Sequence, residues 1–190
     1  MIGRFLFRLR SLTPIPFVLV LAYFSRPTPI SILIGITFLC IGECLRLWSA
    51  GYAGGTTRAQ DLGVARNLIT TGPYAYVRNP LYLGNLLLSF GVCLIANVYW
   101  MIILLFIGYS AQYLPIIASE ENYLREFCGS VYESYFASVP RFLPKIHRYA
   151  NPSKHDFSIS RALKSEKRTL TAIIAVVGLI VGRFLWRQYG

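Results

Sequence analysis

The chain is poor in charged residues and especially poor in acidic ones. Of its 190 residues 14% are charged, and eight Asp and Glu stand against nineteen Lys and Arg. Soluble domains usually have about a quarter of their residues charged. Hydrophobic residues make up 55% of the chain. This balance argues against a water-soluble fold and indicates that lipid is the solvent.

The excess of cations does not indicate nucleic-acid binding, although the net charge is +11. The Lys and Arg lie in short segments between long apolar runs, where membrane proteins place cations beside anionic lipid. We therefore expect the lipid bilayer as the partner, and no nucleic acid.

Cysteine and histidine are too sparse for a disulfide framework or a metal centre. None of the four cysteines forms a Cys-x-x-Cys pair. Cys40 and Cys44 are one helical turn apart, but the only histidines, His147 and His155, lie far away in a polar segment. We expect Cys40 and Cys44 to be small core residues and predict no metal site.

The N-terminus lacks the small-residue cleavage site of a secretory signal peptide. Arg4, Arg8 and Arg10 precede an apolar run, as they would in a signal peptide, but Pro14 and Pro16 interrupt that run. We therefore expect a retained membrane segment.

Long apolar runs, in contrast, are abundant. The sequence contains five of them, at 12–24, 30–50, 81–96, 99–118 and 170–186. The first is short for a spanning helix, which needs roughly 20 residues. Because only Asn97 and Val98 separate the third and fourth runs, these two should form a tight antiparallel hairpin. The pattern predicts an all-α, polytopic transmembrane bundle of about five spans.

The distribution of basic residues predicts the orientation. Arg4, Arg8 and Arg10 place the N-terminus in the cytoplasm, because cytoplasmic segments carry an excess of cations. Segments 51–79 and 119–168 are then cytoplasmic as well. We expect a multi-pass protein of the inner (plasma) membrane with its active site facing the cytoplasm.

Composition divides the chain into four parts. Residues 1–50 hold two spans, and 51–144 form a core with the hairpin and a polar segment. Residues 145–168 are a basic linker, and 169–190 hold the last span. The linker should end in a juxtamembrane helix that continues into that span.

The stretch before the third run is rich in turn-forming and aromatic residues. Gly72-Pro73 predicts a turn, and Pro80 lies near the first helical turn, where its missing N–H costs little. Backbone N–H groups at such a helix start can hold a carboxylate. Tyrosines can stack on a flat ring or surround a cation; here they are Tyr74, Tyr76 and Tyr82. An interfacial aromatic belt over a proline-capped helix explains the same residues.

Charged residues at four other places are candidates for ligand contacts. Glu120-Glu121, where the fourth run ends, should approach the start of the third run, and suits a cationic or hydroxyl-rich ligand. Glu43 and Arg46 lie three residues apart in the second run, where charges are costly. They form either an intrahelical pair or a contact to the head group of a substrate. Arg125 and Arg141 bind the substrate, or else make lipid or structural contacts.

Several motifs occur in a definite order between roughly 45 and 144. They are the Gly-Pro-Tyr stretch at 72–84, the apolar hairpin, Glu120-Glu121, the segment 127–135 and Val139-Pro140-Arg141. This ordered set resembles the isoprenylcysteine carboxyl methyltransferase family and its phospholipid methyltransferase relatives.

The resemblance implies an integral-membrane methyltransferase that uses S-adenosylmethionine. Its acceptor would be lipophilic, an isoprenoid or a lipid, and would enter laterally from the bilayer. Glu120 matches the acidic cofactor ligand, and a carboxylate suits ribose hydroxyls or an amino group. The other cofactor contacts that the resemblance implies are Arg66, Asn67, Leu68, Ile69, Tyr74, Asn79, Pro80, Leu81 and Tyr82.

Two positions depart from the family pattern. Asn79 stands where the family has a histidine, and an asparagine can hydrogen-bond but cannot act as a base near neutral pH. Ile116 stands one turn before Glu120, where prenylcysteine-specific members have an arginine for the substrate carboxylate. We therefore expect prenylcysteine to be a poor acceptor, unless Arg46 or Arg125 replaces that arginine.

Two alternatives remain open at this point. One is a membrane NADPH-dependent reductase of the sterol type, which would need phosphate-binding basic residues beyond Arg58, Arg66 and Arg78. The other is a non-catalytic lipid-binding scaffold. The presence of Tyr74 and Glu120 argues against the scaffold.

Overall fold

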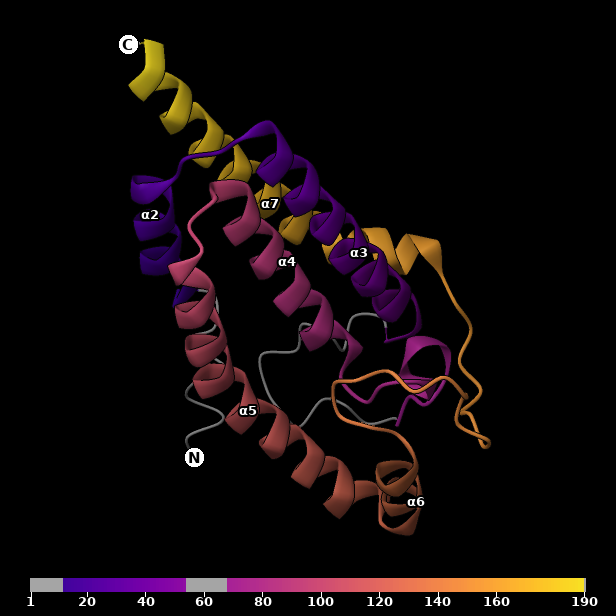
Figure 1. The fold of residues 1–190 in the computed structure, drawn as a ribbon. Helices are drawn as coiled ribbons and strands as arrows, with labels where there is room; N and C mark the ends of the chain where they lie inside the picture. Colours follow the sequence, from indigo (N-terminus) through magenta and orange to yellow (C-terminus); the bar gives the residue numbers. More distant parts are fainter. Residues whose placement is uncertain (1–11, 54–67, 190) are drawn as a thin grey trace.

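The computed structural model describes residues 12–53 and 68–189. Every regular element in these ranges is helical (Figure 1). The elements are α2 (Pro14–Phe24), α3 (Pro29–Ala53), the 3₁₀-helix η2 (Gly72–Ala75), α4 (Pro80–Ala96), α5 (Trp100–Cys128), α6 (Ser130–Ser138) and α7 (Ile159–Tyr189). The predicted residues that lie outside the described ranges are Arg4, Arg8, Arg10, Arg58, Arg66 and Asn67.

Each of the five predicted apolar runs forms a helix, which confirms the all-α membrane bundle. Helices α3, α5 and α7 are long and apolar enough to cross a membrane, while α2 and α4 are apolar but shorter. Their outward faces carry large hydrophobic side chains, such as Leu33, Ile103 and Ile174, which are 68%, 65% and 72% exposed. Such exposure suits lipid and not water. The chain is an integral membrane protein.

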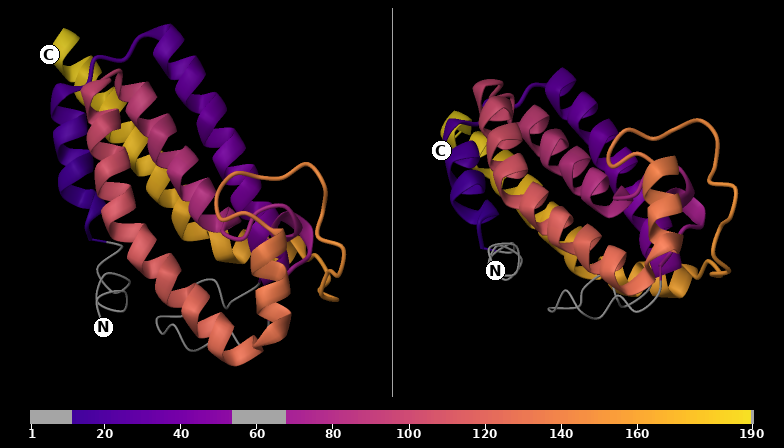
Figure 2. Two further views of the ribbon diagram at one scale, coloured as in Figure 1. Left: turned by 60° about the horizontal axis from the view of Figure 1, so that its bottom comes forward. Right: turned by 90° about the horizontal axis from the view of Figure 1, so that it is seen from below.

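Helix α4 lies at the centre of the bundle (Figure 2). It contacts α2, α3, α5 and α7. Residues from all five apolar helices meet in one hydrophobic core, which includes Leu21, Leu39, Leu88, Met101 and Ile180.

Helices α3 and α4 are packed backbone to backbone through two facing pairs of glycines. A Cβ atom at Gly35 would lie 2.6 Å from the carbonyl oxygen of Gly91, and one at Gly42 would lie 3.0 Å from that of Gly84. The pairs are seven residues apart on both helices. Small residues allow this close approach in a membrane, where the attraction between helices comes from packing and not from water.

The turns at one end of the bundle are joined to each other. Asn97 ends α4 in the left-handed conformation, with φ of 58°. Its side-chain Nδ2 donates to the Arg26 carbonyl at 3.0 Å, and the Arg26 N–H donates to Ala96 at 2.9 Å. η2, α6 and the start of α7 lie at the opposite end (Figure 1). The placement of that second end in the cytoplasm stays a prediction.

Two helices extend beyond the predicted runs. α5 continues to Cys128, so Glu120 and Glu121 lie within a helix and not after it. α7 begins at Ile159, within the predicted basic linker, and continues without a break to Tyr189. The juxtamembrane helix and the last span are therefore one helix, as predicted.

Candidate active site

The Gly-Pro-Tyr segment forms a tight turn against the end of α3. Gly72 has φ of +59°, and a Cβ atom there would lie 2.3 Å from the ring of Tyr52. Glycine is required for both reasons. Gly72 begins η2, and the Val77 N–H closes the turn on the Pro73 carbonyl at 3.1 Å. The turn fixes the position of Tyr74.

Tyr74 lies among charges from three helices. Its carbonyl accepts a hydrogen bond from the Tyr135 hydroxyl at 2.7 Å. Burial raises the pKa of the Tyr74 hydroxyl well above its usual range, with the Glu120 and Glu166 carboxylates adding to the rise and Arg46 opposing it. The hydroxyl is thus a neutral hydrogen-bond donor at physiological pH.

Tyr82 and Glu120 join the start of α4 to α5. The Tyr82 hydroxyl donates to Oε1 of the partly buried Glu120 at 2.8 Å. Tyr109 donates to the Tyr82 carbonyl at 2.6 Å and stacks on Tyr113 with ring centroids 4.2 Å apart. A layer of tyrosines therefore leads from the bundle interior to the Glu120 carboxylate.

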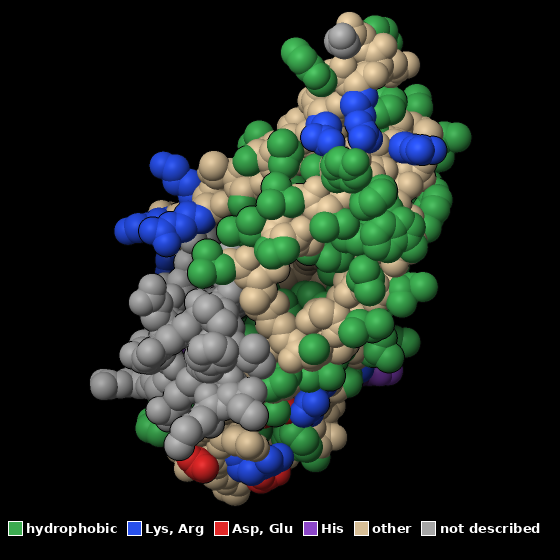
Figure 3. All heavy atoms as spheres, turned by 90° about the vertical axis from the view of Figure 1, so that its left-hand side faces the viewer, with side chains coloured by type: hydrophobic (Ala, Val, Ile, Leu, Met, Phe, Trp, Pro, Cys, Tyr) green, Lys and Arg blue, Asp and Glu red, His purple; other side chains and the backbone are tan. Residues whose placement is uncertain are grey.

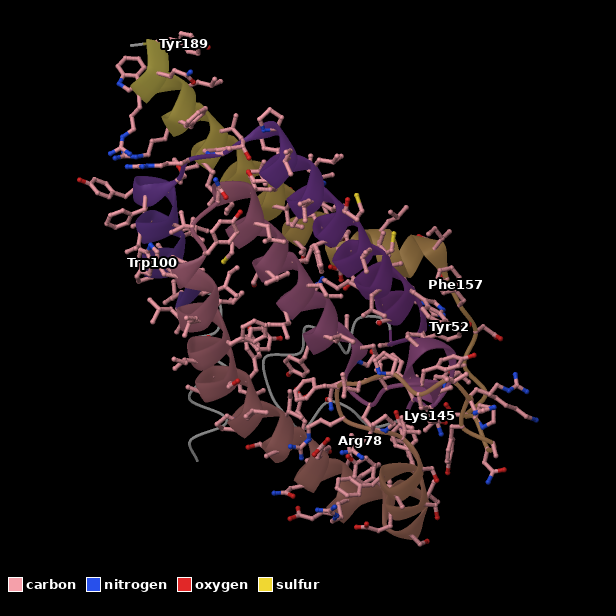
Figure 4. The ribbon with its side chains drawn as sticks, viewed as in Figure 1. Tyr52, Arg78, Trp100, Lys145, Phe157 and Tyr189 are labelled. Atoms are coloured by element: carbon pink, nitrogen blue, oxygen red, sulfur yellow. The ribbon has the colours of Figure 1, made fainter. Side chains whose placement is uncertain are left out.

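Glu121, next to Glu120 along the chain, is buried and held by basic side chains. Its Oε1 accepts from Arg78 Nε and from Arg141 Nε, each at 3.2 Å, and from Asn79 Nδ2 at 3.4 Å. Arg78 also donates to the carbonyls of Phe136 and Val139 at 2.7 Å. Figure 4 shows Arg78 beside the lower part of α5, near α6. This cluster fixes the loop before α4 onto α5 and α6.

Arg46 is the centre of a second buried cluster. Its Nε donates to Glu166 Oε2 at 2.9 Å. Its Nη2 donates to the same oxygen, and also to Thr169 Oγ1 at 3.1 Å. Nη1 donates to Asn85 Oδ1. Glu43, its predicted partner, lies farther away at 3.9 Å. The guanidinium thus connects α3, α4 and α7, with every nitrogen bound to the protein.

The remaining predicted residues lie around these clusters. Leu68 packs against a hydrophobic cluster that includes Ala75 and Tyr132. Pro80 is fully buried at the start of α4. Ile69 and Leu81 are partly buried. Arg125 pairs with Glu133 at 2.5 Å on the exposed side of α5 and α6. Its guanidinium lies over the ring of Phe136, which Arg78 also contacts.

Three partners of Arg46 carry little signal in the sequence: Glu166, Thr169 and Asn85. Glu166 is 1% exposed but lies in a basic stretch that resembles a solvated linker. The available signal was Arg46 itself, because a buried cation requires a strong acidic partner. Arg46 predicts that such a partner exists but does not indicate which acid it is.

Comparison with known proteins connects this geometry to a family. A family model described as phospholipid methyltransferase matches residues 30–130, more than half of the chain. The chain belongs to the phospholipid methyltransferase family. The matched segment holds α3, η2, α4 and α5, and with them Tyr74, Tyr82 and Glu120, so the resemblance seen in the motifs is confirmed.

Three relatives of this family member carry names of two kinds. The protein-S-isoprenylcysteine O-methyltransferase of Schizosaccharomyces pombe is 34% identical over 113 residues, covering 57% of the chain and 48% of the relative. The nickel-cobalt-cadmium resistance protein NccN of Alcaligenes xylosoxydans is 27% identical over 124 residues, 65% of the chain and 53% of the relative. The cobalt-zinc-cadmium resistance protein CzcN of Cupriavidus metallidurans is 25% identical over 154 residues, 81% of the chain and 66% of the relative.

The chain spans about half to two thirds of the length of these relatives. No solved structure matches it significantly. Within 12–53 and 68–189, His, Cys, Asp and Glu form no group of three or more that could hold a metal ion.

Proposed function

We propose that this family member is a methyltransferase that transfers a methyl group from S-adenosylmethionine to a lipophilic acceptor. The observation that carries the proposal is the position of Glu120. Its carboxylate lies at the end of the α4–α5 hairpin that is opposite the Asn97 turn. There it accepts a hydrogen bond from the Tyr82 hydroxyl, and its charge helps to raise the pKa of Tyr74. The family match and the isoprenylcysteine methyltransferase relative support it.

The donors and acceptors at this end suit S-adenosylmethionine. Glu120 offers a carboxylate for ribose hydroxyls or an amino group. The first N–H groups of α4 have no intrahelical partners, and no side chain caps them, so they suit a carboxylate. Within the described residues, the buried Thr71 Oγ1 has no hydrogen-bond partner. A polar ligand beside the Gly72 turn would satisfy it.

The protein would contribute position and exclusion of water, with little acid–base chemistry. The cofactor supplies an activated methyl group on a sulfonium, which is displaced in line by the acceptor, so positioning provides much of the rate. Tyr74 is held by η2 and Tyr135, and Glu121 fixes Asn79 and Arg141. We propose Glu120, Tyr74, Tyr82 and the segment around Leu68, Ile69, Pro80 and Leu81 as the cofactor contacts.

The acceptor would reach the site from the bilayer. Figure 3 shows a face on which hydrophobic side chains dominate the upper part, while the acidic side chains seen there lie near the lower end. A lipid can therefore keep its tail in the membrane while its reactive group lies at the level of Glu120. The guanidinium of Arg46 is engaged by Glu166, Thr169 and Asn85, so we do not assign it to an acceptor carboxylate.

The test is cofactor binding to the purified protein. Calorimetric titration with S-adenosylhomocysteine should show a single site, and NADPH should not bind. Glu120→Ala should weaken that binding by about 1–3 kcal/mol, the range for losing a hydrogen bond to a charged group. Glu126→Ala is the matched control, because Glu126 is an exposed acid on the same helix. Binding of NADPH without binding of S-adenosylhomocysteine would refute the proposal. Equal affinities of wild type and Glu120→Ala for S-adenosylhomocysteine would refute it as well.

A further inference from the structure

The first three turns of α7 combine a buried face with a basic exposed face. Ala162, Ser165 and Glu166 are buried against the bundle. In residues 146–168, one exposed acid, Asp156, stands against six exposed Lys and Arg. These cations are Arg148, Lys154, Arg161, Lys164, Lys167 and Arg168. Most of them lie on α7, at the point where its apolar span begins.

The exposed face is itself divided into two stripes. Ile159 and Leu163, 58% and 51% exposed, are four residues apart and therefore lie one above the other on the helix. Lys164 and Arg168 form a second stripe, rotated by about 100° from the first. An apolar stripe next to a basic stripe is the arrangement of a helix at a membrane surface.

This distribution of charge does not stabilise helix α7 itself. The N-terminal end of a helix carries partial positive charge, so a cation in its first turn, here Arg161, is unfavourable. No acidic residue lies in the first turn of α7. Glu166, in the second turn, is turned inward to Arg46. An anionic surface beside this face would therefore stabilise these cations.

The surface is held firmly in place. The Ser158 N–H donates to the Gly51 carbonyl at 3.1 Å. Phe157 packs on Tyr52 with ring centroids 5.5 Å apart, and the two side chains lie together in Figure 4. A Cβ atom at Gly51 would lie 2.2 Å from the Phe157 ring. The start of α7 is thus fixed to the end of α3.

We propose that the first three turns of α7 bind the head groups of anionic phospholipids in the leaflet that this end of the helix enters. Lys164, Lys167 and Arg168 contact the phosphates at the point where α7 enters the bilayer. The surface lies outside the segment matched by the family model, and its role is independent of the proposed methyl transfer.

The experiment compares lipid binding by the full-length protein in a neutral detergent. Native mass spectrometry measures bound phosphatidylglycerol and phosphatidylcholine at low ionic strength. Wild type should bind phosphatidylglycerol about tenfold more tightly, and added salt should reduce this preference, because exposed charges are screened. Lys164→Gln with Arg168→Gln should remove most of the preference.

The control is Arg148→Gln with Lys154→Gln, which removes the same charge from exposed positions that precede the helix. It should keep most of the preference. Equal binding of the two lipids by wild type, or equal losses in both double variants, would overturn the proposal. So would displacement of the lipid by inorganic phosphate or by a short RNA duplex at equal concentration. Thermal unfolding checks that every variant is folded.

Discussion

Glu120 and Glu121 are consecutive residues of α5, yet their carboxylates have different partners. Glu120 accepts from Tyr82 at 2.8 Å and is partly exposed. Glu121 is 4% exposed and accepts from Arg78 and Arg141. Adjacent helical residues point about 100° apart, so Glu120 faces the Tyr82 hydroxyl while Glu121 faces Arg78 and Arg141.

This difference predicts that alanine substitution of the two acids affects different properties, stability in one case and cofactor affinity in the other. Glu121→Ala should lower the free energy of unfolding by about 3–5 kcal/mol, because it leaves buried cations without their partner. Glu120→Ala should cost much less stability and act mainly on cofactor affinity. Thermal unfolding in detergent and calorimetric titration separate the two effects. Equal stability of Glu121→Ala and wild type would contradict the assignment of Glu121.

The Arg46 cluster predicts that the partner from α7 matters more than the partner on α3. Glu166→Ala should cost several kcal/mol, since a buried arginine loses its main carboxylate. Glu43→Ala should cost less, because Glu43 lies 3.9 Å from Arg46. A double-mutant cycle with Arg46→Ala measures each coupling energy. A larger coupling to Glu43 than to Glu166 would show that the intrahelical pair dominates.

The packing of α3 on α4 predicts that stability depends strongly on the glycine at position 84 and little on the glycine at position 108. Gly84→Ala should destabilise the protein by about 1–3 kcal/mol through overpacking. The added Cβ would lie 2.5 Å from Cγ of Arg46 and 3.0 Å from the Gly42 carbonyl oxygen. Gly108→Ala is the control, because a Cβ there meets nothing within 4 Å. Thermal unfolding should rank the two clearly, and equal effects would argue against the close contact.

The acceptor prediction concerns Ile116. Its side chain is fully buried on α5, so a free prenylcysteine carboxylate would find no cation at this position, and leaving it unpaired costs several kcal/mol. N-acetyl-farnesylcysteine should therefore be a poorer acceptor than a total-lipid extract in an assay with labelled S-adenosylmethionine. Ile116→Arg should improve prenylcysteine turnover, and thermal unfolding checks that this substitution at a buried position leaves the protein folded. Efficient turnover by wild type that survives Arg46→Ala and Arg125→Ala would defeat this argument.

The sequence predicts the helices well because each is a local apolar pattern. All five runs are helices, and η2 forms at the predicted Gly72-Pro73 turn. The sequence also predicts that Tyr82 and Glu120 lie close together, because the hairpin of the third and fourth runs places both residues at one end. Long-range pairing is not a local property. The partnership of Arg46 with Glu166 depends on how α7 packs, and nothing near Arg46 in the sequence indicates it.

Glu166 follows Arg46 by 120 residues, and this separation has a consequence during synthesis. When α3 enters the membrane, the chain that will form α7 has not yet been made. Until then Arg46 has only Glu43, on its own helix, as an acidic neighbour among the contacts described here. The final helix therefore completes the charge balance of a bundle whose other helices are already in place. A nascent chain stopped before Glu166 would expose an incompletely neutralised arginine to the quality-control machinery of the membrane.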